Sequence, residues 1–263
     1  MIDFRILGAL EVRSGTEVFR PRGSLQRRLL VALLASAPNL VLADSLITEL
    51  WSEDCPARVE NALQAHISRL RQQLAALEPG RPGPRLVTHA AGYQLDIDPS
   101  ELDAARFVRG LERERLRLLS EGDPERTVRA LRELLALWRG PVLGGAADSP
   151  LCEAAADRYE ESHLAALELL FDVELEVGEH AKIVPGLRDL LKEYPFHERF
   201  RQQLMIALYR AGRQAEALEA YRELWRRLTE ELGIEPTPAM REYERAVLRH
   251  DPILSSARIG LPG

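Results

Sequence analysis

Three glycines in a repeating apolar pattern constrain the fold of this chain more than any other feature. Each of Gly122, Gly178 and Gly212 has a large apolar residue three positions before it and apolar residues six, nine and twelve positions after it. Gly212 follows Gly178 by 34 residues, which is the period of tetratricopeptide helix pairs. Such repeats are a helix, a tight turn and a second helix, and they stack to bury a common core. The pattern predicts an all-α helical-repeat domain over residues 99–252, followed by a flexible tail over 253–263.

The helical region carries no signature of catalysis. His163, His180 and His197 are spaced by half the repeat period, and equivalent places in successive helices explain this better than a metal site. A phosphate-binding loop, a zinc-protease motif and a nucleophile elbow are all missing from the sequence. With only Cys55 and Cys152, a disulfide framework and a structural zinc site are excluded by count. We therefore expect no enzyme activity, no catalytic residue, no metal and no cofactor.

The first hundred residues have different periodicities. Alternation around Ser14-Gly15 and around Ala90-Ala91-Gly92 is typical of hairpins, whereas the stretches between them have helical spacing, and Ser24 is expected to cap the first helix. The expected elements are a hairpin within Ile2–Phe19, helices over Leu25–Ala35, Asp44–Trp51 and Ala57–Leu77, and a terminal hairpin within Arg85–Asp98. This order is that of a winged helix-turn-helix, and we place it at residues 1–98. The whole chain is then mainly α, with a small α+β N-terminal part.

The third helix, predicted over Ala57–Leu77, has one apolar and one polar face. Its apolar face carries Leu63, Ile67, Leu70, Leu74 and Leu77. Its polar arc carries Arg58, Asn61, Ala65, Ser68, Arg69 and Gln72, and it is flanked by Gln64 and Arg71. Small residues let a helix approach the floor of a DNA major groove, and Arg, Asn and Gln can pair with base edges. The arc is typical of a major-groove reader, although this helix alone leaves an ordinary amphipathic helix with a solvated face open.

The distribution of charge agrees with a DNA-binding N-terminal part. The net charge is −6, yet residues 1–100 hold as many acidic as basic residues, so the acidic excess lies after them. The stretches Arg20–Arg28 and Arg58–His89 are locally basic. A neutral domain with basic stretches, followed by an acidic domain, suits a DNA binder joined to a protein-contacting module. Since the N-terminus lacks a secretion signal and no apolar run could span a membrane, we expect a cytoplasmic protein without a membrane partner.

Three stretches resemble OmpR-type winged-helix domains. DSLITELW (44–51), NALQAHISRLRQQL (61–74) and VTHAAGYQLDI (87–97) are similar to the supporting helix, the recognition helix and the wing. The resemblance implies that Arg69 reads bases, that Asn61, His66 and Arg71 contact phosphates, and that His89 lies at the wing tip. The family more often has Arg where His89 stands, and often a second Arg at Ser68. The predicted base contacts are Gln64, Ala65, Ser68 and Arg69. The predicted phosphate contacts are Asn61, His66 and Arg71, with Arg22, Arg27 and Arg28 from the basic stretch Arg20–Arg28. The wing is predicted to enter the minor groove with Thr88 and His89.

The C-terminal part resembles the bacterial transcriptional activation domain. The resemblance rests on LDAARF (102–107), LWRGPVL (137–143) and QLMIALYRAGRQAEALEAYRELWRRLTEELGIEPTPAMREYERAVL (203–248). Joined to an OmpR-type winged helix, that module is typical of the Streptomyces antibiotic regulatory proteins, and the resemblance covers residues 2–252. It implies an activator whose protomers bind direct repeats in double-stranded DNA head to tail. It also implies contact with RNA polymerase, including its sigma subunit, upstream of an antibiotic biosynthetic gene cluster.

Two functions of different classes follow from the sequence. The leading hypothesis is sequence-specific activation of transcription, in the cytoplasm and on the nucleoid. The alternative is a helical-repeat adaptor protein whose winged helix does not bind DNA. Loss of DNA binding on substitution of Arg69 would separate the two.

Overall fold

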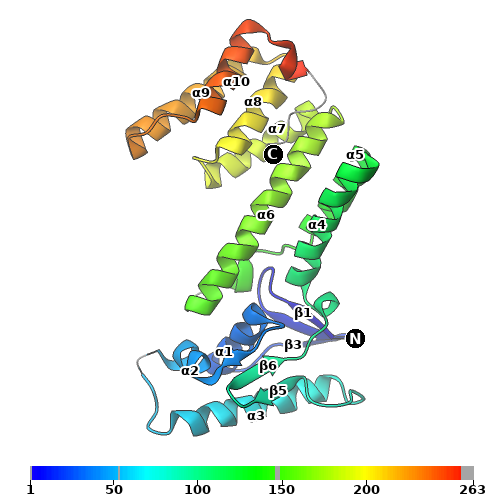
Figure 1. Cartoon of the computed structure of the whole chain (residues 1–263), viewed down its shortest axis with the longest axis vertical. Helices are drawn as coiled ribbons and strands as arrows, with labels where there is room; N and C mark the ends of the chain where they lie inside the picture. The colour runs from blue at the N-terminus through cyan, green and yellow to red at the C-terminus, as the bar shows by residue number, and fades with distance from the viewer. Residues whose placement is uncertain (1, 53, 146–148, 256–263) are drawn as a thin grey trace. The chain divides into compact units, whose positions relative to one another are not determined.

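The computed structural model describes residues 2–52, 54–145 and 149–255, and Figure 1 shows its elements. The N-terminal elements are β1 (Ile2–Arg5), β2 (Glu11–Ser14), β3 (Glu17–Phe19), α1 (Ser24–Ser36), β4 (Val41–Leu42), α2 (Ala43–Trp51), α3 (Val59–Leu77), β5 (Leu86–His89) and β6 (Gly92–Leu95). One antiparallel sheet, of order β1-β2-β3, precedes the helices in sequence. A second, of order β4-β6-β5, joins the two strands after α3 to β4, which lies between α1 and α2. The predicted winged helix is confirmed.

The hairpin predicted around Ser14-Gly15 is formed by β2 and β3, and β1 is a further strand that ends at Arg5, before β2 begins at Glu11. One local prediction for this part is wrong. Ser24 does not cap α1: it is the first helical residue, Gly23 occupies the N-cap position, and no side chain bonds there.

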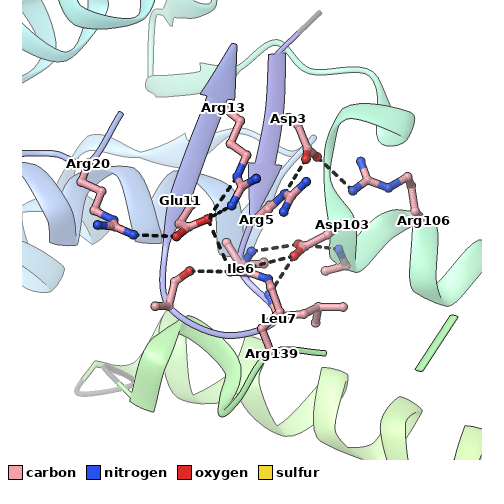
Figure 2. Close-up of polar contacts among 12 residues, drawn as sticks. Asp3, Arg5, Ile6, Leu7, Glu11, Arg13, Arg20, Asp103, Arg106 and Arg139 are labelled. Carbon is pink, nitrogen blue, oxygen red and sulfur yellow. Dashed lines mark hydrogen bonds and ion pairs between the residues drawn. The ribbon is translucent and has the colours of Figure 1, made fainter. Parts of the chain in front are cut away.

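The loop between β1 and β2 is held by hydrogen bonds to residues far along the chain (Figure 2). The buried carboxylate of Asp103 accepts hydrogen bonds from the backbone N–H of Ile6 at 2.8 Å and of Leu7 at 3.2 Å. The backbone N–H of Arg139 donates to the carbonyl of Leu7 at 2.9 Å, and that of Leu143 to the carbonyl of Ile6 at 2.8 Å. Buried backbone groups require such partners. The loop therefore takes its shape from residues that local alternation cannot reveal.

The remaining chain is helical. Its elements are η1 (Pro99–Glu101), α4 (Asp103–Glu121), α5 (Pro124–Leu135), η2 (Val142–Gly145), α6 (Pro150–Glu176), α7 (His180–Glu193), α8 (Glu198–Arg210), α9 (Gln214–Arg227), the π-helix η3 (Leu228–Leu232), α10 (Pro238–Arg249) and η4 (Pro252–Ser255). Gly122, Gly178 and Gly212 lie in the turns α4–α5, α6–α7 and α8–α9, with φ of +64°, +87° and +75°. Glycine adopts this left-handed region without steric cost, which explains its recurrence. The predicted repeat of helix pairs is confirmed.

The described residues form two compact units, residues 1–113 with 133–163 and residues 114–132 with 164–263. The first unit extends past the predicted boundary at residue 98 because later residues bind the N-terminal part. Besides Asp103, Glu101 pairs with the buried Arg85 of the winged helix at 2.5 Å, and Arg85 also pairs with Glu78 at 2.6 Å. The predicted domain boundary therefore does not coincide with the boundary between the compact units.

In the second unit, α8 packs against both α7 and α9 (Figure 1). Its residues Phe200–Leu208 are all buried, and they join one hydrophobic core with residues of α7, α9 and α10. The predicted flexible tail over 253–263 lies mostly outside the described residues. Its first residues belong to the packed unit, because Leu254 is buried and its carbonyl accepts a hydrogen bond from Nε of Arg210 at 2.6 Å. None of the helices in the described ranges combines the length and hydrophobicity needed to cross a bilayer.

Candidate nucleic-acid interface

The predicted base-reading residues lie on the exposed side of α3. Leu63, Ile67, Leu70 and Leu74 are buried and hold the helix against the domain. The predicted base contacts are exposed: Gln64, Ala65, Ser68 and Arg69. Arg69 makes no hydrogen bond or ion pair with any described residue. The structure thus brings these four side chains together on one accessible arc.

The wing lies beside this arc. A pocket of about 290 Å³ is lined by Gln64 of α3 and by Thr88 and His89 of the wing, so recognition-helix and wing residues share one surface. Asp44 and Glu60 line the same pocket. Because carboxylates repel phosphates, the DNA backbone is not expected to lie directly against these two residues.

Arg71 and Gly92 fix the position of the wing. Arg71 donates from Nε to the carbonyl of Leu86 at 2.9 Å and from its terminal nitrogen to the hydroxyl of Thr88 at 2.9 Å. Gly92 allows β6 to approach β4, because a Cβ at that position would lie 2.1 Å from the carbonyl oxygen of Val41. Arg71, predicted as a phosphate contact, therefore also joins α3 to β5.

His89 stands at the wing tip, as the last residue of β5. Its Nε2 lies 2.8 Å from Oε1 of Gln94, whose amide nitrogen donates to the carbonyl of Pro38 at 2.8 Å. The imidazole is exposed and held in place by Gln94, which sequence reasoning did not single out.

His66 is half-buried behind the arc. Its Nδ1 lies 2.9 Å from the amide nitrogen of Gln26, and its ring meets that of Trp51 edge-on with centroids 5.9 Å apart. Burial, with a smaller effect of the positive charge on Arg69, lowers the pKa of His66. A neutral imidazole can still donate one hydrogen bond to a phosphate. Sequence reasoning missed Gln26, although a polar residue in step with the buried Leu29, Leu30 and Leu33 of α1 was a signal.

The other predicted phosphate contacts are exposed but lie on different elements. Asn61 belongs to the first turn of α3, and Arg22 precedes α1. Arg27 and Arg28 lie in the first turns of α1 and line a pocket of about 430 Å³ that also includes Ser149 and Cys152. Arg28 donates a long hydrogen bond of 3.4 Å to the carbonyl of Leu50. These two arginines thus adjoin the beginning of α6 as well as the winged helix.

Comparison with known proteins identifies the family. Residues 102–248 match the family described as bacterial transcriptional activator domain, and residues 22–95 match the family described as transcriptional regulatory protein, C terminal. The transcriptional regulator RedD of Streptomyces coelicolor is 38% identical over 260 residues, which cover 96% of this chain and 72% of RedD. The chain belongs to the Streptomyces antibiotic regulatory protein (SARP) family.

Further relatives support the assignment of this protein to the SARP family. The regulatory protein DnrI of Streptomyces peucetius is 33% identical, and the match covers 95% of this chain and 93% of DnrI. A solved structure of EmbR from Mycobacterium tuberculosis, in complex with a low-affinity phosphopeptide, superposes with a TM-score of 0.89 at 30% identity. It covers 97% of this chain and 68% of the EmbR chain. The SARP protein is therefore a transcriptional regulator with the winged-helix and helical-domain fold of its family.

Proposed function

We propose that this SARP regulator activates transcription by binding a specific DNA sequence through α3. The observation that carries the proposal is the exposed arc of Gln64, Ala65, Ser68 and Arg69, on which Arg69 has no partner among the described residues. An arginine can donate two hydrogen bonds to one guanine, and Ala65 and Ser68 are small enough to let the backbone approach the groove floor. We assign base reading to these four residues.

The contacts around the arc position the protein on the duplex. Asn61, His66, Arg71 and the arginines Arg22, Arg27 and Arg28 are proposed to contact phosphates, which adds affinity without sequence information. Thr88 and His89 are proposed to enter the adjacent minor groove. Since His89 is an imidazole rather than a guanidinium, its attraction to a narrow minor groove is expected to be modest.

The proposed operator is a direct repeat. A winged helix has no two-fold symmetry of its own, and this sequence has no sustained heptad to impose a symmetric dimer. Protomers that bind head to tail repeat one heterologous contact along the same DNA face, which matches a direct repeat. We further propose that the helical domain contacts RNA polymerase, including its sigma subunit, at the promoter of an antibiotic biosynthetic gene cluster, in the cytoplasm and on the nucleoid.

A footprint of the purified protein on promoters from its own genomic neighbourhood tests DNA binding and repeat orientation together. We expect two protected half-sites in direct orientation, one helical turn of roughly 10–10.5 bp apart or a multiple of it. Inserting roughly 5 bp rotates the second half-site to the opposite face of the duplex and should abolish cooperative binding. Equal affinity for direct and inverted repeats would refute the arrangement and leave DNA binding intact.

The alternative is an adaptor protein with a winged helix that does not bind DNA. It predicts no protected site on any promoter and no difference between the natural protein and Arg69→Ala in DNA affinity. Salt-dependent binding that Arg69→Ala weakens would exclude it.

A further inference from the structure

A pocket of about 340 Å³ lies over α8, between α7 and α9, within the second compact unit. Buried apolar side chains line it: Leu191, Leu204, Leu208 and Ala220. Its volume falls at the lower end of the range typical of small-molecule sites. The pocket shares no residue with the winged helix, so what it binds is a question separate from DNA recognition.

Arg201 is the unusual member of this pocket. The residue is only 2% exposed, and one terminal nitrogen donates to Oε2 of Glu223 at 3.0 Å. Its Nε is buried and has no hydrogen-bond partner among the described residues. Burial lowers the pKa of Arg201, which reflects the cost of removing the guanidinium from water. A buried donor without a partner is unfavourable, so an acceptor that reached Nε would stabilise the site.

The pocket carries charges of both signs, with cations in excess. Arg188, Lys192 and Arg227 line it together with Arg201, and three glutamates of α9 face them. Each glutamate already lies near an arginine: Glu216 near Arg188 and Arg213, Glu219 near Arg222, and Glu223 near Arg201 and Arg227. The pocket still carries one more cation than glutamates, and Nε of Arg201 remains without an acceptor among the described residues, whereas the three glutamates disfavour a ligand with two negative charges.

We propose that this pocket binds a small organic carboxylate, whose charged group pairs with Arg201 and whose apolar part packs on Leu204 and Leu208. A carboxylate matches the planar fork of a guanidinium and carries a single charge. An inorganic anion would leave the apolar walls without a partner. The proposal goes beyond DNA recognition and does not depend on it.

Calorimetric titration of the full chain with hexanoate tests the proposal, with hexanamide as the neutral control of the same shape. We expect saturable binding of hexanoate and binding of hexanamide weaker by about tenfold or more, since charge-assisted hydrogen bonds to arginine are lost. A short peptide that ends in leucine, with a free or an amidated C-terminus, supplies the carboxylate from a second source. Binding of the free peptide with no binding of hexanoate would overturn the proposal of a small ligand.

Two lysines of α7 provide matched variants. Lys192 lines the pocket and Lys182 does not, yet their side chains are 77% and 74% exposed and each pairs with an acidic residue three positions before it. We expect Lys192→Glu to weaken hexanoate binding by about fivefold and Lys182→Glu to leave it within about twofold, because only one of the reversed charges adjoins the ligand. Equal effects of the two variants, or equal binding of hexanoate and hexanamide, would overturn the proposal.

Arg201→Met removes the buried charge and keeps an apolar side chain of similar length. If circular dichroism shows a folded protein, we expect hexanoate binding to disappear. Unchanged binding in the folded variant would overturn the proposal, and if the variant does not fold, the lysine pair and the hexanamide control decide.

Discussion

Two helices of this protein contain almost the same hexapeptide in opposite surroundings. Residues 69–74 of α3 read RLRQQL, and residues 199–204 of α8 read RFRQQL. In α3 the first arginine and the first glutamine are exposed, whereas in α8 residues 200–204 are buried. The difference arises because α8 packs against α7, α9 and α10, while the outer face of α3 has no protein against it in the described residues.

The partners of the equivalent side chains differ accordingly. Arg199 pairs with Asp172 at 2.5 Å, and Gln203 donates to Asp172 at 2.7 Å and to the carbonyl of Glu168 at 2.8 Å. Arg69 has no such partner. Arg199 and Gln203 of α8 are therefore used to stabilise the fold, whereas Arg69 of α3 remains available to an external partner. The comparison predicts that one substitution at equivalent positions will change stability in α8 and binding in α3.

The largest effect on stability is expected from Gln203→Ala. It removes the hydrogen bonds to Asp172 and to the carbonyl of Glu168 and leaves a cavity at a fully buried position, so the free energy of unfolding should fall by about 2–4 kcal/mol. Gln73→Ala, at the equivalent position of α3, removes no hydrogen bond to a described residue and should cost under about 1 kcal/mol. The side-chain carbonyl oxygens of both glutamines are buried without a partner among the described residues, so the difference comes from the two hydrogen bonds that Gln203 donates. Urea unfolding of both variants measures the difference, and equal losses would refute the comparison.

Substituting the first arginine of each hexapeptide should change a different property in each helix: stability for Arg199 and DNA binding for Arg69. We expect Arg199→Ala to lower the free energy of unfolding by about 1–3 kcal/mol, because it breaks a largely buried ion pair with Asp172. We expect Arg69→Ala to leave it within about 0.5 kcal/mol and to lower discrimination between operator and random DNA by about 1–3 kcal/mol. Gel-shift titrations on both DNAs measure discrimination, and an unchanged ratio would show that Arg69 does not read bases.

Substituting Arg71 should change both stability and DNA binding, because Arg71 binds the wing and also borders the exposed arc. Arg71→Ala should cost about 1 kcal/mol of stability through its lost hydrogen bonds. It should weaken specific and non-specific DNA binding alike and reduce the salt dependence by about one unit of slope. A loss confined to the operator would contradict the phosphate contact and leave only the role of Arg71 in holding β5.

The smallest effect concerns Glu216 of α9, an exposed carboxylate that pairs with Arg213 and Arg188. Arg213, followed by Arg188, lowers the pKa of Glu216 to about 2. Since this pKa is below its ordinary value of 4.5, the stabilisation is present above pH 4.5 and is lost as the pH falls toward 2. In an NMR titration, Arg213→Ala with Arg188→Ala should raise this pKa toward 4.5. A pKa that stays near 2 in the double variant would show that the arginines are not its cause.

The sequence predicted the features that depend on local periodicity. The buried face of α3, the wing hairpin around Ala90 and Ala91, and the glycine turns at Gly122, Gly178 and Gly212 follow from spacings of a few residues, and the structure confirms them. The exposed arc of α3 was predictable for the same reason. Its contacts with DNA remain predictions, because exposure alone does not show what binds.

Only the tertiary structure decided which polar side chains are used inside the protein. The loop after β1 depends on Asp103, and the position of His66 depends on Gln26, 97 and 40 residues away in sequence. The same holds for the two hexapeptides: local spacing makes both helical, but Asp172 and Glu223 reach only the one in α8. The physical reason is that periodicity fixes a helix and its apolar face, whereas burial and pairing of a polar group depend on segments that the fold brings together.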